Sequence, residues 1–401
     1  MSANAIRHGL TRPVAALLRV GAVVSAFVVA ACQPMGMTSD TGPSTGATIE
    51  PGAPVPVALL VPGGSGNADL EWLSRSLTNA ARMAAADAQG AQIDLRIYET
   101  GGNSATAVAR ANEAADAGAK IILGPLFAES ANAVGAAMQG RNINVLSFSN
   151  NADIAGGNVF VLGNTFNNVA DRLISYGVRQ NKRRLLIVAE SDVAGQVGAN
   201  AIAGAAARNG ATISGRVNHP LTPAGIDGVA PQIASAAQSG QIDAIFMTAN
   251  NQAVLPYLTE KLAEAGVSSQ VTQFMGLTRW DEPRSRLAMP QLQGGWFAIP
   301  DTTMTAQFES RYRAAHGEAP HGLGSLAYDG VAAIASLARG GNRNALTTGG
   351  LTQGAGFRGV NGLFRLRPDG TNQRAMAVAT IRNNAVVILD PAPRQFGRFG
   401  F

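Results

Sequence analysis

The sequence of 401 residues contains a single cysteine, Cys32, and is poor in aromatic and charged residues. One cysteine cannot form a disulfide within the chain, so no disulfide framework holds the fold. Only 5% of the residues are aromatic and 14% are charged. A nucleic-acid groove needs clustered basic and aromatic side chains, so we expect no nucleic-acid partner.

Sequence motifs of catalysis are also scarce. A glycine-rich turn before Asp69 lacks the third glycine of a dinucleotide fingerprint, because Asp69 stands in its place. His316, Glu318 and His321 cannot share one helix face, since Pro320 interrupts any such helix. No P-loop occurs, and no general base is evident. We therefore expect no enzyme, no cofactor and no metal site.

The first 31 residues have the pattern of a signal peptide. They contain Arg7, Arg12 and Arg19 but no acid, and residues 20–31 form an uncharged run. This run is too short for a bilayer core, which needs about 20 residues. Removal of residues 1–31 would lower the net charge from +5 to +2, because three arginines are lost.

Cys32 directly follows this apolar run, in the sequence Val-Ala-Ala-Cys that resembles a bacterial lipobox. The resemblance implies cleavage before Cys32 and lipidation of its sulfur and amine. Buried acyl chains would hold the protein at a membrane surface. Gln33, in place of an aspartate, resembles the sorting signal of outer-membrane lipoproteins. We expect a periplasmic protein bound to the membrane through the lipid anchor only, at the outer rather than the inner membrane.

Residues 32–53 are rich in small and polar residues, which predicts a flexible tether. Beyond them, short apolar runs alternate with alanine-rich helical patterns, and the remaining chain exceeds what one core usually holds. Strands are predicted at 57–61, 93–98, 120–123, 144–147, 185–189, 212–217, 244–248 and 273–276. The expected fold class is α/β, with two doubly wound parallel-sheet lobes and a cleft between them.

Six segments, in this order and spacing, resemble the type I periplasmic-binding fold, specifically the leucine-binding family of ABC transporter substrate-binding proteins. They are 57–62 (VALLVP), 98–103 (YETGGN), 121–126 (IILGPL), 274–276 (FMG), 327–330 (AYDG) and 357–362 (FRGVNG). The resemblance covers about 55–388. It implies three passages between lobes, near 163, 291 and 345. The expected first lobe is 54–163 plus about 291–345, the second is 164–290 plus about 346–390, and 391–401 is a tail.

The carboxyl ends of parallel strands and the amino ends of the following helices would line the cleft, where free N–H groups suit a carboxylate. The resemblance implies seven ligand-binding positions. In the first lobe they are Ala128 and Ser130, where the family holds the ligand carboxylate, and Ser149, Asn150 and Asn151, where the family has small residues and a threonine. In the second lobe they are Asn250, where the family often has an aromatic residue, and Thr278, where amino-acid binders have an acid. An Asn/Ser turn is the alternative for 149–151.

The absence of an acid at Thr278 matters for the ligand, because an enclosed ammonium group without a carboxylate is unfavourable. We therefore expect a small polar or amino-acid-like ligand rather than specifically a free amino acid.

Two tryptophan-containing segments carry a second resemblance, to lipoprotein activators of penicillin-binding proteins. They are 276–283 (GLTRWDEP) and 294–301 (GGWFAIPD). Trp280 and Trp296 would be partner contacts if exposed, since tryptophans are frequent interface hot spots. The alternative is that both belong to the core or the hinge.

Two functions thus remain open. The first is a solute-binding lipoprotein that captures a ligand for an ABC permease. The alternative is an activator lipoprotein that regulates peptidoglycan synthesis through contact with a penicillin-binding protein.

Overall fold

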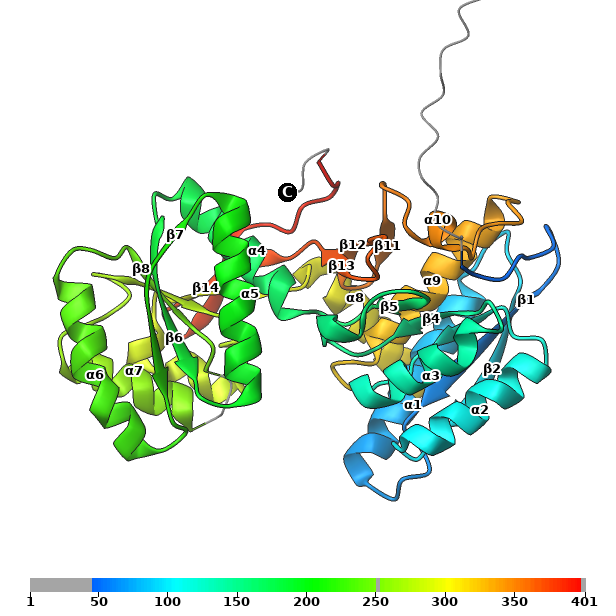
Figure 1. Ribbon diagram of the computed structural model, residues 1–401, viewed down its shortest axis with the longest axis horizontal. Coiled ribbons are helices and arrows are strands. Elements are labelled where there is room, and N and C mark those ends of the chain that lie inside the picture. Colours follow the sequence, from blue (N-terminus) through cyan, green and yellow to red (C-terminus); the bar gives the residue numbers. More distant parts are fainter. Residues whose placement is uncertain (1–44, 250–252, 398–401) are drawn as a thin grey trace, which may run out of the picture. The chain divides into compact units, whose positions relative to one another are not determined.

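Short buried strands and longer helices alternate along the chain, as the sequence pattern predicts. The structure is a computed structural model that describes residues 45–249 and 253–397, so Cys32 and Asn250 lie outside the described residues. Figure 1 shows helices arranged around two separate large sheets. The five-stranded sheet defines the first lobe and the seven-stranded sheet defines the second. This is the predicted α/β class with two doubly wound lobes.

The first lobe is built on five parallel strands in the order β2-β1-β3-β4-β5. They are β1 (Val55–Val61), β2 (Ile93–Glu99), β3 (Ile121–Leu123), β4 (Asn144–Ser147) and β5 (Val159–Val161). The connections contain α1 (Ala68–Ala86), α2 (Ser104–Asp116), α3 (Ala128–Gln139) and the 3-10 turn η1 (Ala152–Ile154). These connections return the chain to the start of the sheet, and the strands are therefore parallel.

The second lobe has seven strands in the order β15-β14-β10-β9-β8-β6-β7. They are β6 (Arg184–Glu190), β7 (Thr212–His219), β8 (Ala244–Met247), β9 (Gln273–Gly276), β10 (Trp296–Ile299), β14 (Ala377–Arg382) and β15 (Ala385–Asp390). The connections contain α4 (Phe166–Arg179), α5 (Val193–Asn209), α6 (Pro223–Gln238), α7 (Val254–Glu264), η2 (Arg284–Ala288) and η3 (Pro290–Leu292). Strands β6–β10 are parallel, whereas β14 and β15 form an antiparallel edge.

The remaining elements complete the first lobe. They are α8 (Thr302–His316), α9 (Ser325–Arg339), α10 (Thr348–Leu351) and the antiparallel strands β11 (Phe357–Gly359), β12 (Gly362–Leu366) and β13 (Asn372–Arg374). Helix α9 packs against α1. Phe357 and Phe364 are buried in the same core as the residues of β1. This small sheet therefore belongs with the first lobe.

Helices cover both faces of each large sheet (Figure 1). In the first lobe, α1 and α9 bury one face through residues such as Leu77, and α2 and α3 bury the other through residues such as Val134. In the second lobe, α6 and α7 cover one face with Ile233, and α4 and α5 cover the other with Leu173. Double coverage explains why the strands are continuous apolar runs rather than alternating patterns.

The chain passes between the lobes at 162–165, 300–301 and 375–376. The second and third passages differ from the expected positions near 291 and 345. Strand β10 pairs with β9 and β14, so the chain stays in the second lobe up to Ile299. The strands between 362 and 390 form two pairs, β12 with β13 and β14 with β15, and Phe364 is in the first-lobe core. Tertiary pairing, which the local pattern does not reveal, decides both boundaries.

Residues 45–53, expected to be part of a flexible tether, are bound to the first lobe. The Thr45 hydroxyl donates to Oδ1 of Asn144 over 3.0 Å, and the Thr45 backbone carbonyl accepts from Nδ2 of Asn144 over 3.2 Å. Ile49 is buried in the core, with 3% exposure. The tether prediction is wrong for this stretch, because partners about 100 residues away supply bonds that composition does not show.

Gly46 is the tightest point of this bound segment. Its N–H donates to Oδ1 of Asn142 over 2.8 Å, and its carbonyl accepts from Nδ2 of Asn142 over 3.0 Å. Its φ of +118° is one that side chains rarely adopt, and a Cβ would lie 2.5 Å from the Leu346 carbonyl oxygen. Only glycine fits here without displacing the segment.

The substitution Gly46→Ala is expected to detach residues 45–50. We expect a loss of about 1–3 kcal/mol in urea unfolding and faster protease cleavage near residue 46, since both strain and a clash are introduced. Gly52→Ala is the matched control, because Gly52 also has a positive φ (+81°) but no atom within 4 Å of a Cβ. A Gly46→Ala protein with an unchanged cleavage rate would contradict the docking.

Asp243 joins the starts of β6 and β8. Its carboxylate accepts from the backbone N–H groups of Arg183 and Arg184, over 3.0 and 2.9 Å, and from Nη2 of Arg184 over 2.7 Å. The hydrogen bond from the Arg184 side chain is the main cause that lowers the pKa of Asp243 to about 2. The folded state therefore favours the ionised carboxylate.

The substitution Asp243→Asn should cost about 1–2 kcal/mol at pH 7, allowing for solvent screening of a partly exposed pair. Because the folded pKa lies below the unfolded value, the contribution is complete above about pH 4 and is lost as the pH falls toward 2. Urea unfolding at several pH values should show the difference from wild type shrinking over that window. Asp116→Asn, whose side chain is 69% exposed, is the control. A pH-independent difference would contradict this account.

Candidate functional site

The loops that follow β1, β3 and β4 lie next to one another at one edge of the first sheet. Strand β1 pairs with β3, and β3 pairs with β4, all in the same direction. The carboxyl ends of these strands therefore meet, and the segments 62–67, 124–127 and 148–151 share an edge. The expected first-lobe ligand positions are all in or just after these segments.

Ser149 and Asn151 belong to a chain of local hydrogen bonds. The Ser147 hydroxyl donates to the Pro125 carbonyl and accepts from the Ser149 N–H, both over 3.1 Å. The Ser149 hydroxyl accepts from the Asn151 N–H over 3.1 Å, and Ser149 is 5% exposed. These bonds match the Asn/Ser turn that the sequence left as an alternative. Asn150, between them, is exposed.

Ala128 and Ser130 lie in the first turn of α3, and this helix begins without a side-chain cap. The N-cap residue is Phe127, whose side chain accepts no hydrogen bond. By contrast, α1, α2 and α5 are capped by the side chains of Asn67, Asn103 and Asp192. The backbone N–H groups at the start of α3 thus have no cap acceptor, and they are able to bind an anion. The exposed Glu129 adds one acid to this turn.

The Ser130 hydroxyl is buried, with 2% exposure, and its oxygen lies 3.0 Å from the hydroxyl oxygen of Ser104. It therefore joins α3 to the start of α2. A ligand would reach the backbone N–H groups of this turn more readily than the Ser130 side chain.

In the second lobe, Thr278 donates from its hydroxyl to the Ala249 carbonyl over 3.0 Å, so its side chain closes a loop. Asn250 lies outside the described residues. Sequence reasoning missed Glu190, the last residue of β6, which is 2% exposed and whose backbone N–H donates to the Thr248 hydroxyl over 3.0 Å. The signal was an acid directly after an apolar strand.

A hollow of about 210 Å³ brings one expected ligand residue together with the second lobe. Asn150 lines it with Ala152, Asp153, Thr165, Phe166, Asn167, Val197, Asn200, Ala201, Gly204 and Arg208. Arg208 is paired with Asp171 over 3.0 Å. The other expected positions do not line this hollow.

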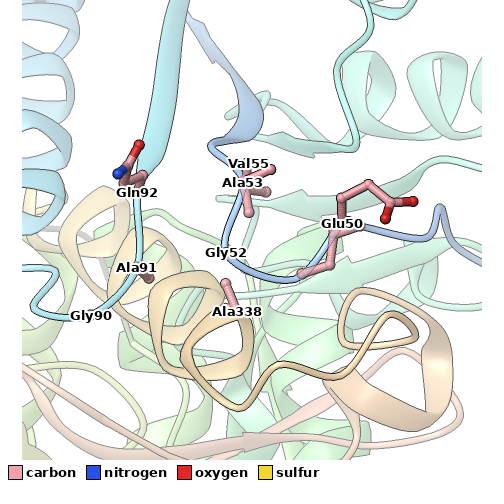
Figure 2. A pocket seen from close by; sticks show the side chains of 9 residues that line it. Glu50, Gly52, Ala53, Val55, Gly90, Ala91, Gln92 and Ala338 are labelled. Carbon is pink, nitrogen blue, oxygen red and sulfur yellow. The ribbon is translucent and has the colours of Figure 1, made fainter.

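A second hollow of about 320 Å³ lies at the opposite edge of the first sheet. Figure 2 shows its lining side chains where the bound amino-terminal segment passes the chain before β2 and the end of α9. Glu50 is at its rim, and Val55 and Gln92 lie at the amino ends of β1 and β2. It is therefore separate from the strand-end loops described above.

Trp280 and Trp296 are buried, so neither is available as a partner contact. Trp280 is 0% exposed in the core of the second lobe, and a Cβ on Gly276 or on Gly295 would lie 2.1 Å from its ring. Trp296 is 9% exposed and packs edge-on against Tyr176, with the ring centroids 4.8 Å apart. Both tryptophans are therefore core residues, as the alternative interpretation of the sequence has it. Gly276 and Gly295 lack side chains and so make room for the Trp280 ring.

Truncation of Trp280 should destabilise the protein strongly. We expect Trp280→Ala to cost about 3–5 kcal/mol in urea unfolding, as for other large buried side chains. Trp280→Phe should cost clearly less, because the buried Nε1 has no hydrogen-bond partner among the described residues and no bond is lost. Equal stability of Trp280→Ala and wild type would contradict the buried position.

Comparison of the sequence with protein-family models matches residues 54–385 to the family described as periplasmic binding protein. Comparison with curated proteins finds none that matches. Among the described residues, no helix has the length and apolar character needed to cross a bilayer.

Solved structures with a similar fold cover nearly the whole described chain. A branched-chain amino acid ABC transporter protein from Rhodospirillum rubrum aligns with a TM-score of 0.71 at 16% identity, covering 84% of this chain and 100% of its own. An ABC transporter substrate-binding protein from Sphaerobacter thermophilus aligns with a TM-score of 0.65 at 16% identity, covering 87% of this chain and 99% of its own. An ABC transporter substrate-binding protein from Desulfitobacterium hafniense, in complex with Leu, aligns with a TM-score of 0.61 at 19% identity, covering 84% of this chain and 100% of its own. At these identities the likeness concerns the fold.

Proposed function

Because this chain belongs to the periplasmic binding protein family, we propose that it is a solute-binding protein for ABC-type transport. It takes up a small amino-acid-like or polar ligand between its two lobes and presents it to a permease. The similar structure from Rhodospirillum rubrum is described as a branched-chain amino acid ABC transporter, and that from Desulfitobacterium hafniense as an ABC transporter substrate-binding protein in complex with Leu. The protein acts by binding, without chemical conversion of the ligand.

The observation that carries this proposal is the way the lobes are joined. Two doubly wound lobes are connected by three short passages, at 162–165, 300–301 and 375–376. Short passages of this kind act as a hinge, about which two lobes can close over a ligand. Ligands of open α/β sheets bind outside the carboxyl ends of the strands, and the polar loops described above lie there.

The uncapped start of α3 supports recognition of a carboxylate. The first three N–H groups of the helix, from Ala128 to Ser130, precede the first helical bond, which runs from the Ala131 N–H to the Phe127 carbonyl. No side chain caps this end. The partial positive charge of a helix start would stabilise an α-carboxylate there.

Glu190 supports recognition of an ammonium group by the second lobe. Thr278 offers no acid, but Glu190 is an acid at the carboxyl end of β6, and its backbone N–H donates to the Thr248 hydroxyl. We assign to Glu190 the part that an acid after β9 plays in the resembling amino-acid binders. A zwitterionic ligand would then meet a helix start on one lobe and an acid on the other.

Exposed apolar side chains near the strand ends of both lobes also fit a protein that closes over its ligand. Phe127 is 39% exposed after β3, and Val193 and Val197 are 81% and 37% exposed at the start of α5. Closure or ligand binding would remove such side chains from water, which is favourable.

The proposal includes a lipid anchor at Cys32 and a position outside the cytoplasm, at the outer membrane. Family membership agrees with an extracytoplasmic location. If Cys32 is the anchor, residues 33–44 separate it in the sequence from the segment that is bound to the first lobe. The activator role is not proposed further, because the two tryptophans offered as partner contacts are buried.

The test is a pair of substitutions at the N-cap of α3. Phe127→Asp would supply the missing cap, which should stabilise the helix by about 1 kcal/mol. The aspartate carboxylate would then occupy the place that we propose for the ligand carboxylate. We expect calorimetric titration with L-leucine, other amino acids and amides to show saturable binding to the wild type, weakened at least tenfold by Phe127→Asp.

Phe127→Ala is the matched control, since it also removes the ring but adds no carboxylate, and it should retain most of the affinity. Binding equally weakened in both variants would assign the effect to the ring and contradict the helix-start site. No saturable binding of any of these compounds to the wild-type protein would contradict the proposed function.

A further inference from the structure

Arg374, the last residue of β13, is a buried arginine with an incomplete set of partners. Its side chain is 6% exposed. Nε donates to the Leu162 carbonyl over 2.8 Å and Nη1 donates to Oδ2 of Asp329 over 2.9 Å, while the guanidinium lies 4.9 Å from the Phe364 ring centroid. Nη2 is buried and has no acceptor in the part of the chain that the structure describes. A buried polar group left unpaired needs an explanation, such as a bound water, ion or ligand.

Arg172 shows that the same region can provide every side-chain nitrogen of a buried arginine with an acceptor. Its side chain is 2% exposed, and Nε donates to the Met376 carbonyl over 2.6 Å. Nη1 donates to a carboxylate oxygen of Asp390, and Nη2 to the carbonyls of Asp390 and Pro391. The missing acceptor is therefore particular to Arg374 and is not general to buried arginines here.

A cavity of about 40 Å³ lies beside Arg374, at the point where the three passages meet. Its lining residues are Asn164, Pro300, Leu326, Asn361, Arg374, Ala375 and Met376. Each passage contributes one or more of them. A water molecule needs about 10–15 Å³ of such volume, so the cavity has room for a group of about three non-hydrogen atoms.

Arg374 already forms an ion pair with Asp329, so the cavity offers a further acceptor hydrogen-bond donors rather than an unpaired charge. Asp329 is 0% exposed, and its two oxygens are engaged by the Val360 N–H, over 2.7 Å, and by Arg374. None of the lining residues is acidic, and Asn164 and Asn361 add carboxamides. The Asn361 Nδ2 donates to the Ser325 hydroxyl over 2.7 Å, which leaves Asn164 and Arg374 as the main donors.

We propose that this hinge cavity binds a carboxylate group, which accepts a hydrogen bond from Nη2 of Arg374. Nη2 itself is covered, so a small rotation of the guanidinium toward the cavity accompanies binding. Arginine is well suited to this task, because its N–H groups match the two oxygens of a carboxylate. An occupant that prefers one hinge conformation would also shift the population of lobe positions. The carboxylate is either a free small anion or part of the ligand held between the lobes.

The test is a titration of the full-length protein with sodium formate at constant ionic strength. Calorimetry measures the binding, and the melting temperature of the protein is measured at each formate concentration. We expect saturable binding and a rise in melting temperature. Formamide has the same number of non-hydrogen atoms but no charge, and it should give no saturable effect. Arg374→Lys keeps the charge beside Asp329 but loses Nη2, and it should weaken formate binding at least tenfold. Arg172→Lys is the matched control and should leave formate affinity unchanged.

If Arg374→Lys does not fold, Ala375→Val is a second variant. It fills the cavity without changing any charge, and it should also abolish formate binding. No saturable formate binding, equal binding of formamide, or unchanged binding in a folded Arg374→Lys or Ala375→Val protein would overturn the proposal.

A competition experiment assigns the source of the carboxylate. Suppression of formate binding by saturating L-leucine would support a ligand carboxylate in the cavity, whereas additive binding would support a separate anion site. Formate binding without any amino-acid binding would leave this inference standing while the proposed function fails, so the two failures are distinguishable.

Discussion

Parallel pairing is the constraint on which the rest of this structure depends. Parallel neighbours require connections that return the chain to the same end of the sheet, so the parallel strands of one sheet end at one edge. In the first lobe this rule brings together the loops after β1, β3 and β4. In the second it places Glu190 beside Thr248. Polar residues that are far apart in the sequence become neighbours because the backbone pairing leaves them no other place.

The junction between the lobes depends on a second set of interactions. The Asn372 carboxamide donates to the carbonyls of Val161 and Gly163, over 2.8 Å each, and accepts from Nδ2 of Asn168 at the start of the second lobe. The Asn168 carboxamide oxygen accepts from the Arg374 N–H over 3.1 Å. Amide side chains therefore satisfy the backbone where no sheet continues, which a buried passage requires.

Departures from the sequence predictions concern contacts between distant segments. The small, polar composition of residues 45–53 predicts a flexible tether, but Asn142 and Asn144 bind this segment. Trp280 stands in a polar segment typical of a surface, but glycines at 276 and 295 leave space for its ring inside the core. In each case the decisive partner lies too far along the chain for a local pattern to identify it.

By itself, the sequence determined the alternation of strands and helices, the division into two doubly wound lobes and the family, because hydrophobic periodicity and turn residues act over short distances. Only the tertiary structure decided where the second and third passages lie, that α3 starts without a cap, and that Arg374 is buried with an unpaired nitrogen. Those features depend on which distant groups meet and which hydrogen bonds remain unmade, and no run of neighbouring residues encodes that outcome.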